Sequence, residues 1–508
     1  MKSLSRRSFL SNSAATLSVY AVPAVVGAEA PTQLDATTLQ VTTRTLDIGG
    51  RAATVKGIVD TSGRSGLVLD PGASFRVDLS NNLNEETIVH WHGQIPPNVM
   101  DGVSNTTPMI APGTSRSFDF MPRSGTYWMH SHVPAQEIDL LAAPLIVRSP
   151  GDIAKDRQEV VMFLHDFSFR SGEEILADFT SGAAMDHGRV QDGSQIDAKP
   201  RRIIGSHSSD PMQMPGMAGM DHGAMAMPGM DHGGMTMDLN DFEFDAYLAN
   251  DRTLDDPEIV PVDKGGRVLL RIINASSMTA FWIDLGGSNG ELVAVDGDLV
   301  EPSYGSRFGV AMGQRLDIEV KIPADGTAVP VLALREGARE RTGLILAPAG
   351  AQVPKIVSMS DNSHPAFSGD VSLESALRAK HPLAIKRPDR THMVMLGGAM
   401  SPYSWTINGQ LWGRHTPIAV LQGERIEMMF HNMSMMAHPM HLHGHVFQVV
   451  NVNGTRIAGA IRDTVHVPAM GMVTVAFDAG EVAPWMLHCH HMAHMATGMM
   501  TELDVRSV

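Results

Sequence analysis

Cysteine is nearly absent from this chain, because Cys489 is the one cysteine in 508 residues. A single thiol excludes any disulfide within the chain, so the fold is held together without one. Such a leftover thiol is either buried and inert or committed to a metal ion. The chain also contains 23 histidines and 35 methionines, which are side chains that can bind metals together with a thiol. Whether such residues surround Cys489 therefore decides between the two interpretations.

Positive charge and long apolar runs are scarce as well. Lys and Arg number 39 against 55 Asp and Glu, which gives a formal net charge of −16. An acidic chain repels phosphate, and we therefore expect neither nucleic acid nor an anionic membrane surface as a partner. The apolar run within residues 1–30 is too short and too often interrupted to cross a bilayer, so we expect no stable membrane insertion.

The N-terminus carries a pair of arginines. Arg6 and Arg7 are followed by Phe-Leu, a modest apolar run and the small residues of "VGAEA". This pattern resembles a twin-arginine export signal. We expect residues 1–30 to be this signal, with cleavage just after Ala28 or Ala30, the twin-arginine export machinery as a partner, and a mature protein in the periplasm. Since that route carries folded proteins, often with their cofactor, it favours a metal at the lone thiol.

Glycine and proline, in contrast, are abundant, with 48 and 30 residues. So much turn chemistry favours β structure over helix bundles. The length predicts about two to four domains.

One pattern recurs three times along the chain. In each copy a glycine precedes an asparagine by nine residues, with apolar and polar residues alternating between them; the copies lie at 71–83, 264–276 and 422–434. Alternation of period two after a glycine turn predicts a half-buried strand. Three copies with the same spacing predict three copies of one β domain.

Short polar or Pro/Gly-containing links near 150–158 and 348–356 separate these copies. We therefore expect domain 1 at 31–150, domain 2 at 151–352 and domain 3 at 353–508, each of a length that suits a β-sandwich. Domain 2 is the longest because an insert interrupts it.

Four His-x-His pairs stand out in the first and third copies. Nine residues after the repeated asparagine, copies one and three have histidine where copy two has Ile283. The four pairs comprise His90, His92, His130, His132, His441, His443, His488 and His490. Residues i and i+2 of a strand share one face, so each pair presents two imidazoles, which suit Zn, Cu, Fe or Ni. Two mononuclear sites are one possibility, but the matched positions favour one cluster shared between domains 1 and 3.

Cys489 lies between two of these histidines and points to the opposite face of the strand. It can therefore bind a different ion while it stays joined to the cluster by short stretches of backbone. His438, His494 and Met499 are the further candidates around it, and Cys, two His and a weak axial Met form the ligand set of a blue-copper site. A structural zinc site is the alternative, but methionine suits zinc poorly.

The motifs "HWHG", "HSH", "HPMHLHGH" and "HCHHMAHMATGMM" together resemble the four copper motifs of the multicopper oxidases. The resemblance covers essentially the whole mature chain. It implies an all-β fold of three consecutive cupredoxin-like Greek-key β-sandwich domains. In this family four electrons, taken singly from a reducing substrate, reduce dioxygen to two waters at a cluster of three copper ions.

The resemblance also implies a role for each ligand, with copper as the cofactor in four ions. His438, Cys489 and His494 would hold the type 1 copper with Met499 axial, and His90 and His441 would hold the type 2 copper. The type 3 pair would be held by His92, His130, His132, His443, His488 and His490.

Asp101 stands where relatives carry an acid near the cluster, and we expect it to assist proton delivery; the alternative is an aspartate of an ordinary turn. Met495 stands where bacterial copper-oxidising relatives often have Glu, which puts the usual proton route in doubt.

A biased insert at about 181–240 interrupts domain 2. Its segment 210–238 contains nine methionines: Met212, Met214, Met217, Met220, Met225, Met227, Met230, Met235 and Met237. The density of Gly and Pro predicts a flexible loop without a core of its own. Thioethers select Cu(I), so we interpret the segment as a collector of cuprous ions. The alternative is a linker with no role.

A second methionine group directly precedes the type 1 ligand His438. If exposed, Met435 or Met436 could hold Cu(I) within electron-transfer reach of His438; the alternative is that they are core residues. Ser434 stands where close copper-oxidising relatives place Asp, so the substrate site is weaker or built differently.

The sequence thus predicts a monomeric periplasmic multicopper oxidase that oxidises Cu(I) to Cu(II) with O2 as acceptor and so confers copper resistance. A laccase-like oxidase of phenols is the alternative within the same class. A periplasmic copper-binding or storage protein without turnover is the alternative of a different class.

Overall fold

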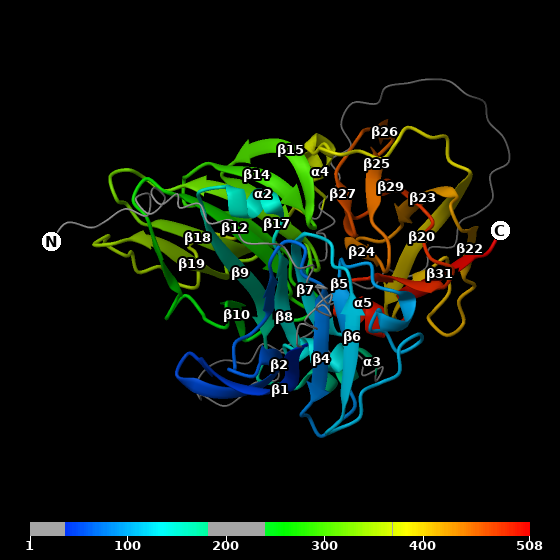
Figure 1. The fold of residues 1–508 in the computed structure, drawn as a ribbon, viewed down its shortest axis with the longest axis horizontal. Coiled ribbons are helices and arrows are strands. Elements are labelled where there is room, and N and C mark those ends of the chain that lie inside the picture. Colours follow the sequence, from blue (N-terminus) through cyan, green and yellow to red (C-terminus); the bar gives the residue numbers. More distant parts are fainter. Residues whose placement is uncertain (1–35, 181–238, 368) are drawn as a thin grey trace, which may run out of the picture. The chain divides into compact units, whose positions relative to one another are not determined.

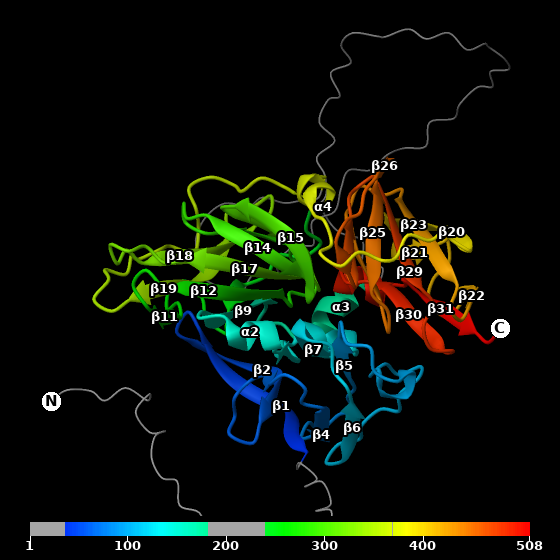
Figure 2. The same cartoon turned by 45° about the horizontal axis from the view of Figure 1, so that its top comes forward.

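The computed structural model describes residues 36–180, 239–367 and 369–508. These residues form three cupredoxin-like β-sandwiches in succession, with few and short helices (Figure 1). The sandwiches appear as separate bodies in Figure 2, in blue for the first, green for the second and yellow to red for the third. The predicted signal at 1–30 and the methionines of 210–238 lie outside the described residues.

Domain 1 is built of two sheets. Its strands are β1 (Thr37–Ile48), β2 (Arg51–Asp60), β3 (Leu67–Leu69), β4 (Phe75–Asn81), β5 (Val89–His92), β6 (Ser115–Phe120), β7 (Gly125–Ser131) and β8 (Ala142–Val147). The sheet orders are β2-β1-β4-β6 and β3-β8-β7-β5.

Domain 2 is also a two-sheet sandwich. Its strands are β9 (Gln158–Phe167), β10 (Ala246–Ala249), β11 (Ile259–Val262), β12 (Arg267–Asn274), β13 (Phe281–Asp284), β14 (Gly290–Val295), β15 (Asp298–Gly305), β16 (Arg307–Val310), β17 (Arg315–Lys321), β18 (Val329–Arg335) and β19 (Arg341–Pro348). The sheet orders are β10-β9-β12-β17-β14-β15 and β11-β19-β18-β13-β16.

Domain 3 repeats this architecture. Its strands are β20 (Arg390–Met400), β21 (Tyr403–Ile407), β22 (Ile418–Leu421), β23 (Arg425–Asn432), β24 (His438–Leu442), β25 (Phe447–Val452), β26 (Thr455–Arg456), β27 (Ile461–Arg462), β28 (Thr464–Val467), β29 (Met472–Asp478), β30 (Pro484–Cys489) and β31 (Met500–Arg506). The sheet orders are β21-β20-β23-β29-β25-β26, with β27 paired to β25, and β22-β31-β30-β24-β28.

Short helices connect the strands. They are α1 (Pro134–Ile138), α2 (Pro150–Ala154), α3 (Gly172–Thr180), α4 (Ser372–Ala376), α5 (Met492–Ala496) and the 3-10 helix η1 (Asn98–Met100). In the part of the chain that the structure describes, no helix has the length and apolar character needed to cross a membrane.

The three strands predicted from the recurring pattern, β4, β12 and β23, occupy the same place in their sheets. Each pairs in parallel with the first strand of its domain (β1, β9, β20) and in antiparallel fashion on its other side (β6, β17, β29). The glycine that precedes each strand has a positive φ, between 71° and 80°, which only glycine adopts without strain. The pattern's glycine is therefore the turn that opens the strand.

The asparagine at the end of each strand ties down the loop that follows. Asn81, Asn274 and Asn432 are fully buried, and each side chain donates to two or more backbone carbonyls while its oxygen accepts a backbone N–H two residues on. A buried amide that satisfies three backbone groups fixes the chain because leaving any of them unpaired costs about 1–3 kcal/mol. In domains 1 and 3 the strand with the first His-x-His pair begins a few residues later.

The prediction of a half-exposed strand fails for β12. β4 alternates between buried and half-buried positions as expected, but β12 is buried at seven of its eight residues. Its second face packs on domain 1, where Ile273 lies with Trp128 and Ala142, and Arg271 donates to Thr126 Oγ1 at 2.9 Å. Domain 2 thus packs closely against domain 1 through the second face of β12.

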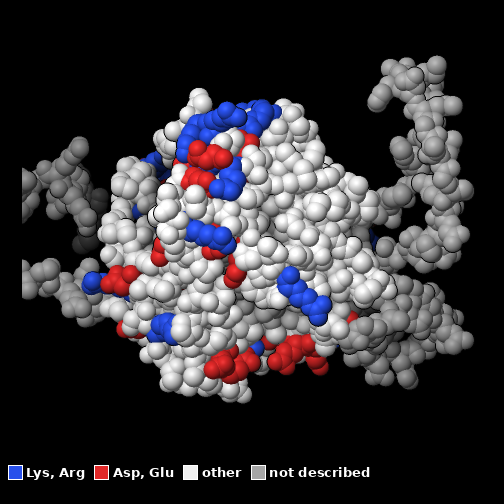
Figure 3. All heavy atoms as spheres, turned by 90° about the vertical axis from the view of Figure 1, so that its right-hand side faces the viewer, with Lys and Arg blue, Asp and Glu red and all other residues white. Residues whose placement is uncertain are grey.

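The surface that faces the viewer in Figure 3 is largely uncharged. Its Lys and Arg groups are interspersed with Asp and Glu groups over this face. Each domain core below the surface is made of buried aliphatic and aromatic side chains, each contributing about 1.5–3 kcal/mol by burial.

Candidate metal centres

Eight histidines converge between domains 1 and 3. His90 on β5 is paired across the strands with His130 on β7, and His441 on β24 is paired with His488 on β30. The other four follow two residues later: His92 within β5, and His132, His443 and His490 one residue past the ends of β7, β24 and β30. All eight are buried, and several groups of three offer nitrogen atoms within 4.8 Å of one another. The shared cluster predicted from the sequence is therefore present as a constellation of side chains, near the centre of Figure 1 where β5, β7 and β24 lie.

Pairs of ring nitrogens face each other within this cluster, one of them across the interface and one inside domain 3. His90 and His441 each donate from Nδ1 to a backbone carbonyl, at 2.7 and 2.8 Å, and their Nε2 atoms are 3.4 Å apart. His443 and His488 also donate from Nδ1, and their Nε2 atoms are 3.0 Å apart. Two acceptor nitrogens at this distance repel each other unless a cation lies beside both. Histidines arranged in this way could hold a metal ion.

A further group lies on the other side of the cluster. His92 Nδ1 is 3.4 Å from His130 Nε2, and the His490 ring lies within 5.2 Å of both neighbouring rings. Within the described residues, neither nitrogen of His490 has a hydrogen-bond partner, nor has Nε2 of His132. Orphaned buried nitrogens are costly, and a bound metal would satisfy them.

Three carboxylates orient these imidazoles. Asp101 Oδ2 accepts from His443 Nδ1 at 2.8 Å, so the predicted acid does lie beside the cluster. Glu137 Oε2 accepts from His130 Nδ1 at 2.8 Å, and Asp463 Oδ1 lies 3.1 Å from His92 Nε2. Acids of this kind fix the tautomer and orientation of metal-bound histidines.

Sequence reasoning missed Glu137 and Asp463. The only local signal for Glu137 is its position five residues after His132, in "HSHVPAQE". Asp463 approaches His92 from 371 residues away, and no spacing could have indicated it.

Burial keeps the imidazoles neutral. It lowers the pKa of His92, His132, His441, His443 and His490 well below the ordinary value, and neighbouring imidazoles lower it further. Neutral imidazole is the form that binds metals, so the cluster is ready for ligation at neutral pH.

Cys489 belongs to a separate group. Its Sγ lies 3.7 Å from His438 Nδ1 and 3.6 Å from His494 Nδ1, and those two nitrogens are 3.1 Å apart. Met499 is fully buried beside them, where its carbonyl accepts the Cys489 N–H and its N–H donates to the carbonyl of His494. His488 and His490 belong to the histidine cluster instead. The two imidazoles and the sulfur between them thus lie in different groups, as expected because side chains alternate between the two faces of a strand.

The outer nitrogens of the two histidines beside Cys489 are held by side chains. Ser434 Oγ lies 2.8 Å from His438 Nε2, and Asp241 Oδ2 lies 3.0 Å from His494 Nε2. Burial raises the pKa of Asp241, which also accepts a hydrogen bond of 2.5 Å from Tyr403. Asp241 was not predicted, because it reaches His494 across 253 residues.

Domain 2 lacks the His-x-His pairs but touches the cluster. Gly313 has a φ of +79°, and a Cβ there would lie 2.9 Å from the His490 ring and 3.3 Å from that of His92. Arg315, fully buried, donates to both oxygens of Asp463 and, at 3.1 Å, to the carbonyl of Thr126 in domain 1. One guanidinium thus joins all three domains behind the cluster.

The methionines near His438 differ in exposure. Met435 is 37% exposed, whereas Met436 is 4% exposed and packs in the domain 3 core. Met436 also lines a cavity of about 20 Å³ together with His491 and with Met312 of domain 2. The core interpretation therefore applies to Met436. Met495 is buried with the core of domain 2, and no carboxylate stands at its position.

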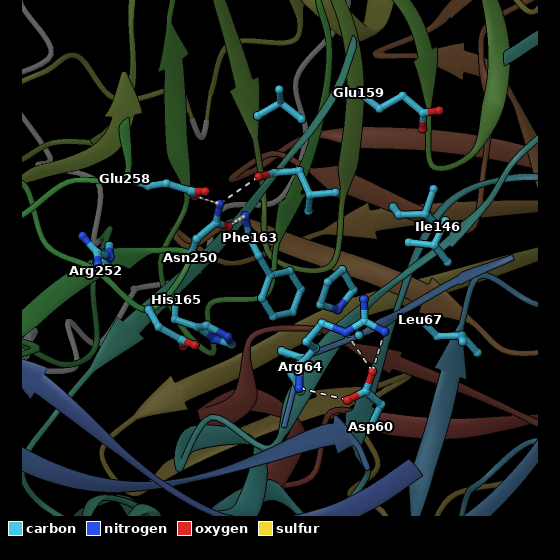
Figure 4. Close-up of a pocket in the computed structure, with 18 of the residues that line it drawn as sticks. Asp60, Arg64, Leu67, Ile146, Glu159, Phe163, His165, Asn250, Arg252 and Glu258 are labelled. Atoms are coloured by element: carbon cyan, nitrogen blue, oxygen red, sulfur yellow. Dashed lines mark hydrogen bonds and ion pairs between the residues drawn. The ribbon is translucent and has the colours of Figure 1, made fainter. Parts of the chain in front are cut away.

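A much larger cavity, of about 1040 Å³, lies between domains 1 and 2 (Figure 4). Several of its polar groups bind one another: Arg64 pairs with Asp60 at 2.8 Å, and Asn250 donates to Glu258 at 2.5 Å. Its lining includes none of the predicted metal ligands. We therefore place the chemistry at the histidine and cysteine groups.

The fold and these two groups define the class: a three-domain cupredoxin-like protein with places for a mononuclear and a multinuclear metal centre. The family description "Multicopper oxidase" matches residues 40–152, 221–333 and 385–508. The chain belongs to the multicopper oxidase family.

Curated relatives agree with this assignment. Multicopper oxidase MmcO of Mycobacterium tuberculosis is 32% identical over 85% of this chain and 79% of its own. Copper resistance protein A of Escherichia coli is 25% identical over 99% of both chains, and laccase-5 of Trametes villosa is 25% identical over 84% and 81%. Among solved structures, Fet3p, described as a multicopper oxidase that functions in iron import, matches with a TM-score of 0.70 and 17% identity over 92% and 90%.

The donor set fits the copper that this family implies. Thiolate with imidazole suits copper at Cys489, and imidazole alone suits it at the cluster. The orphaned nitrogens of His490 and the facing nitrogen pairs are the structural observations that call for bound cations.

Proposed function

We propose that this multicopper oxidase oxidises Cu(I) to Cu(II), with O2 reduced to water, and so protects against copper from the periplasm. The observation that carries the choice of substrate is the exposed thioether of Met435 beside Ser434, whose hydroxyl contacts the type 1 candidate His438. Cuprous ion is the substrate that thioethers select. The nine methionines at 210–238 and the relatives named copper resistance protein support the same substrate.

We assign the ligands as follows. His438, Cys489 and His494, with Met499 axial, would hold a type 1 copper, and His90 and His441 a type 2 copper. The type 3 pair would be held by His92, His130 and His490 on one side and by His132, His443 and His488 on the other, which makes four ions. When bound, copper would supply one-electron chemistry at Cys489 and dioxygen reduction at the cluster.

The chain's own residues provide a path for electron transfer and groups that deliver protons. The Cys489 backbone leads directly into His488 and His490, so an electron received at the thiolate has a short covalent path to the cluster. Asp101 and Glu137 hold carboxylate oxygens at the ring nitrogens of His443 and His130. With Met495 in place of an acid, we assign proton delivery to these two buried carboxyls.

The other features follow from the sequence. The paired arginines at the N-terminus support twin-arginine export to the periplasm. Because domains 1 and 3 of one chain complete the cluster, a monomer suffices for activity. The segment 210–238 would raise the local concentration of Cu(I) beside the enzyme.

Laccase-like oxidation of phenols is the second candidate, and the match to fungal laccases favours it. A copper store without turnover is the candidate of a different class. The backbone link between Cys489 and the cluster argues against storage, which needs no electron path between sites.

Oxygen uptake with Cu(I) and with a phenol, measured on the full chain and on a variant lacking 210–238, separates these functions. We expect about four Cu(I) consumed per O2 and a loss of Cu(I) turnover at low Cu(I) in the deletion variant. Turnover of the phenol alone would identify a laccase, and Cu(I) binding without oxygen uptake would identify a store. Unchanged Cu(I) turnover with increased phenol turnover in the deletion variant would refute the collector role.

A further inference from the structure

The outer face of one domain 3 sheet exposes an unusual number of methionines. The strands β20, β23 and β29 lie side by side in this sheet, and their inner face is buried. On the outer face the side chains of Met393, Met395 and Met472 are 59%, 38% and 37% exposed. Methionine gains by burial about as much as leucine, so a group of exposed ones indicates a use other than packing.

Strand register arranges these side chains in rows. Met395 on β20, His431 on β23 and Met472 on β29 are directly paired, so one imidazole lies between two thioethers. Met393 and Met429 form the next row toward the start of β23. Directly paired residues share a face, with Cβ atoms about 4.5–5.5 Å apart, which lets neighbouring side chains reach one ion.

The rows continue toward the Cys489 group. After β23, Met433 and Met470 are 50% and 62% exposed, and the Met470 N–H donates to the Ser434 carbonyl at 3.0 Å. Ser434 Oγ in turn lies 2.8 Å from Nε2 of His438. The path to the type 1 candidate ligand is therefore a few bonds and one hydrogen bond long from Met433, which precedes Ser434 in the chain, and contains two hydrogen bonds from Met470.

The donors of this face match one kind of ion. Thioethers are soft ligands that select Cu(I), and an imidazole is compatible with them. Oxidised copper prefers nitrogen and oxygen donors, so a methionine-rich site holds Cu(I) and releases Cu(II).

We propose that this methionine face, defined by the paired rows on β20, β23 and β29, is the substrate-binding surface for Cu(I). Each bound Cu(I) gives up one electron through Ser434 and His438 and leaves as Cu(II). Four such electrons, with one O2 and four protons, yield two waters. The inference rests on the proposed function and names the surface at which that substrate binds.

The test replaces the two thioethers of the central row. The double variant Met395→Leu/Met472→Leu conserves volume and removes both sulfurs. The control is Met121→Leu/Met359→Leu, two exposed methionines that lie outside the face. KM and kcat are measured for Cu(I) and for a phenol, and Ag(I), which prefers thioethers but is not oxidised, serves as a redox-inactive probe in titration calorimetry.

We expect the central-row variant to raise KM for Cu(I) about tenfold or more, since even outer-shell changes at metal sites cost about 10- to 100-fold in affinity. Its kinetics with the phenol stay unchanged, and it loses Ag(I) binding that the control variant keeps. Equal KM for Cu(I) and equal Ag(I) binding in both variants would overturn the methionine face while leaving Cu(I) oxidation intact. A native enzyme that consumes phenol but no Cu(I) would overturn the proposed function itself.

Discussion

The guanidinium of Arg315 provides the sharpest test of how domain 2 supports the cluster. Arg315→Met keeps an apolar stem of similar length but leaves the Asp463 carboxylate without its partner. It also removes donors from the carbonyls of Thr126, Gly313 and Asp296, at 3.1, 2.9 and 3.0 Å. Both ends of the ion pair are fully buried, and breaking such a pair from one side costs about 3–5 kcal/mol.

This cost converts into a shift of the melting temperature. At about 2.1 cal/mol/K per residue, the roughly 470 residues from Thr37 to Val508 have an unfolding entropy of about 1 kcal/mol/K. Arg315→Met should therefore lower the melting temperature by about 3–5 °C in differential scanning calorimetry. The control Arg390→Met breaks a solvent-screened surface pair with Glu424 and should shift the melting temperature by about 1 °C or less.

A functional difference should accompany the thermal one. Asp463 contacts His92 and, through its carbonyl, His441, whereas Cys489 lies in a separate group. Arg315→Met should slow oxygen reduction and leave the blue absorption of the Cys489 site intact. Equal melting temperatures for the Arg315 and Arg390 variants would refute the reasoning that one buried guanidinium joins the three domains.

Three further predictions follow from single contacts. Glu137→Gln keeps an oxygen that accepts a hydrogen bond from His130 but cannot deliver a proton. Reoxidation of the reduced enzyme by O2, measured by stopped flow, should therefore slow about tenfold or more. An unchanged rate would exclude Glu137 as a proton donor. Gly313→Ala places a Cβ 2.9 Å from the His490 ring, so metal analysis should show loss of cluster copper, and full copper content would contradict this close approach. Burial lowers the pKa of His165 to about 4. As the pH falls from 6.5 to 4, the unfolded chain therefore takes up a proton at this histidine that the folded chain does not. The free energy of unfolding falls with pH over that window. His165→Phe should remove up to about 1.4 kcal/mol per pH unit of this slope in denaturant unfolding, and an unchanged slope would contradict it.

The sequence predicted which histidines and cysteine gather better than it predicted the residues that hold them in place. A His-x-His pair on a strand must present both imidazoles to one face, so the positions of His90 and His92 followed from local geometry alone. The same geometry placed Cys489 on the opposite side from His488 and His490. These predictions needed no knowledge of what lies across the interface.

The supports come from distant segments, and no local rule determines them. Asp241 and Arg315 reach the metal groups only because domain 2 packs against both other domains. The burial of both faces of β12 has the same origin, since its second face rests on domain 1. Met435 and Met436 lie beyond the end of β23 at Asn432. The alternation of inward and outward side chains along a strand therefore does not tell which of the two is exposed.

The central claim is that Cys489 and its neighbouring histidines serve separate ions joined by a few bonds of backbone. Copper counting with visible absorption on Cys489→Ser tests it most directly. We expect a colourless protein with three copper ions instead of four and no oxygen uptake. A variant that stays blue, or that loses the cluster copper and keeps the single site, would contradict the account.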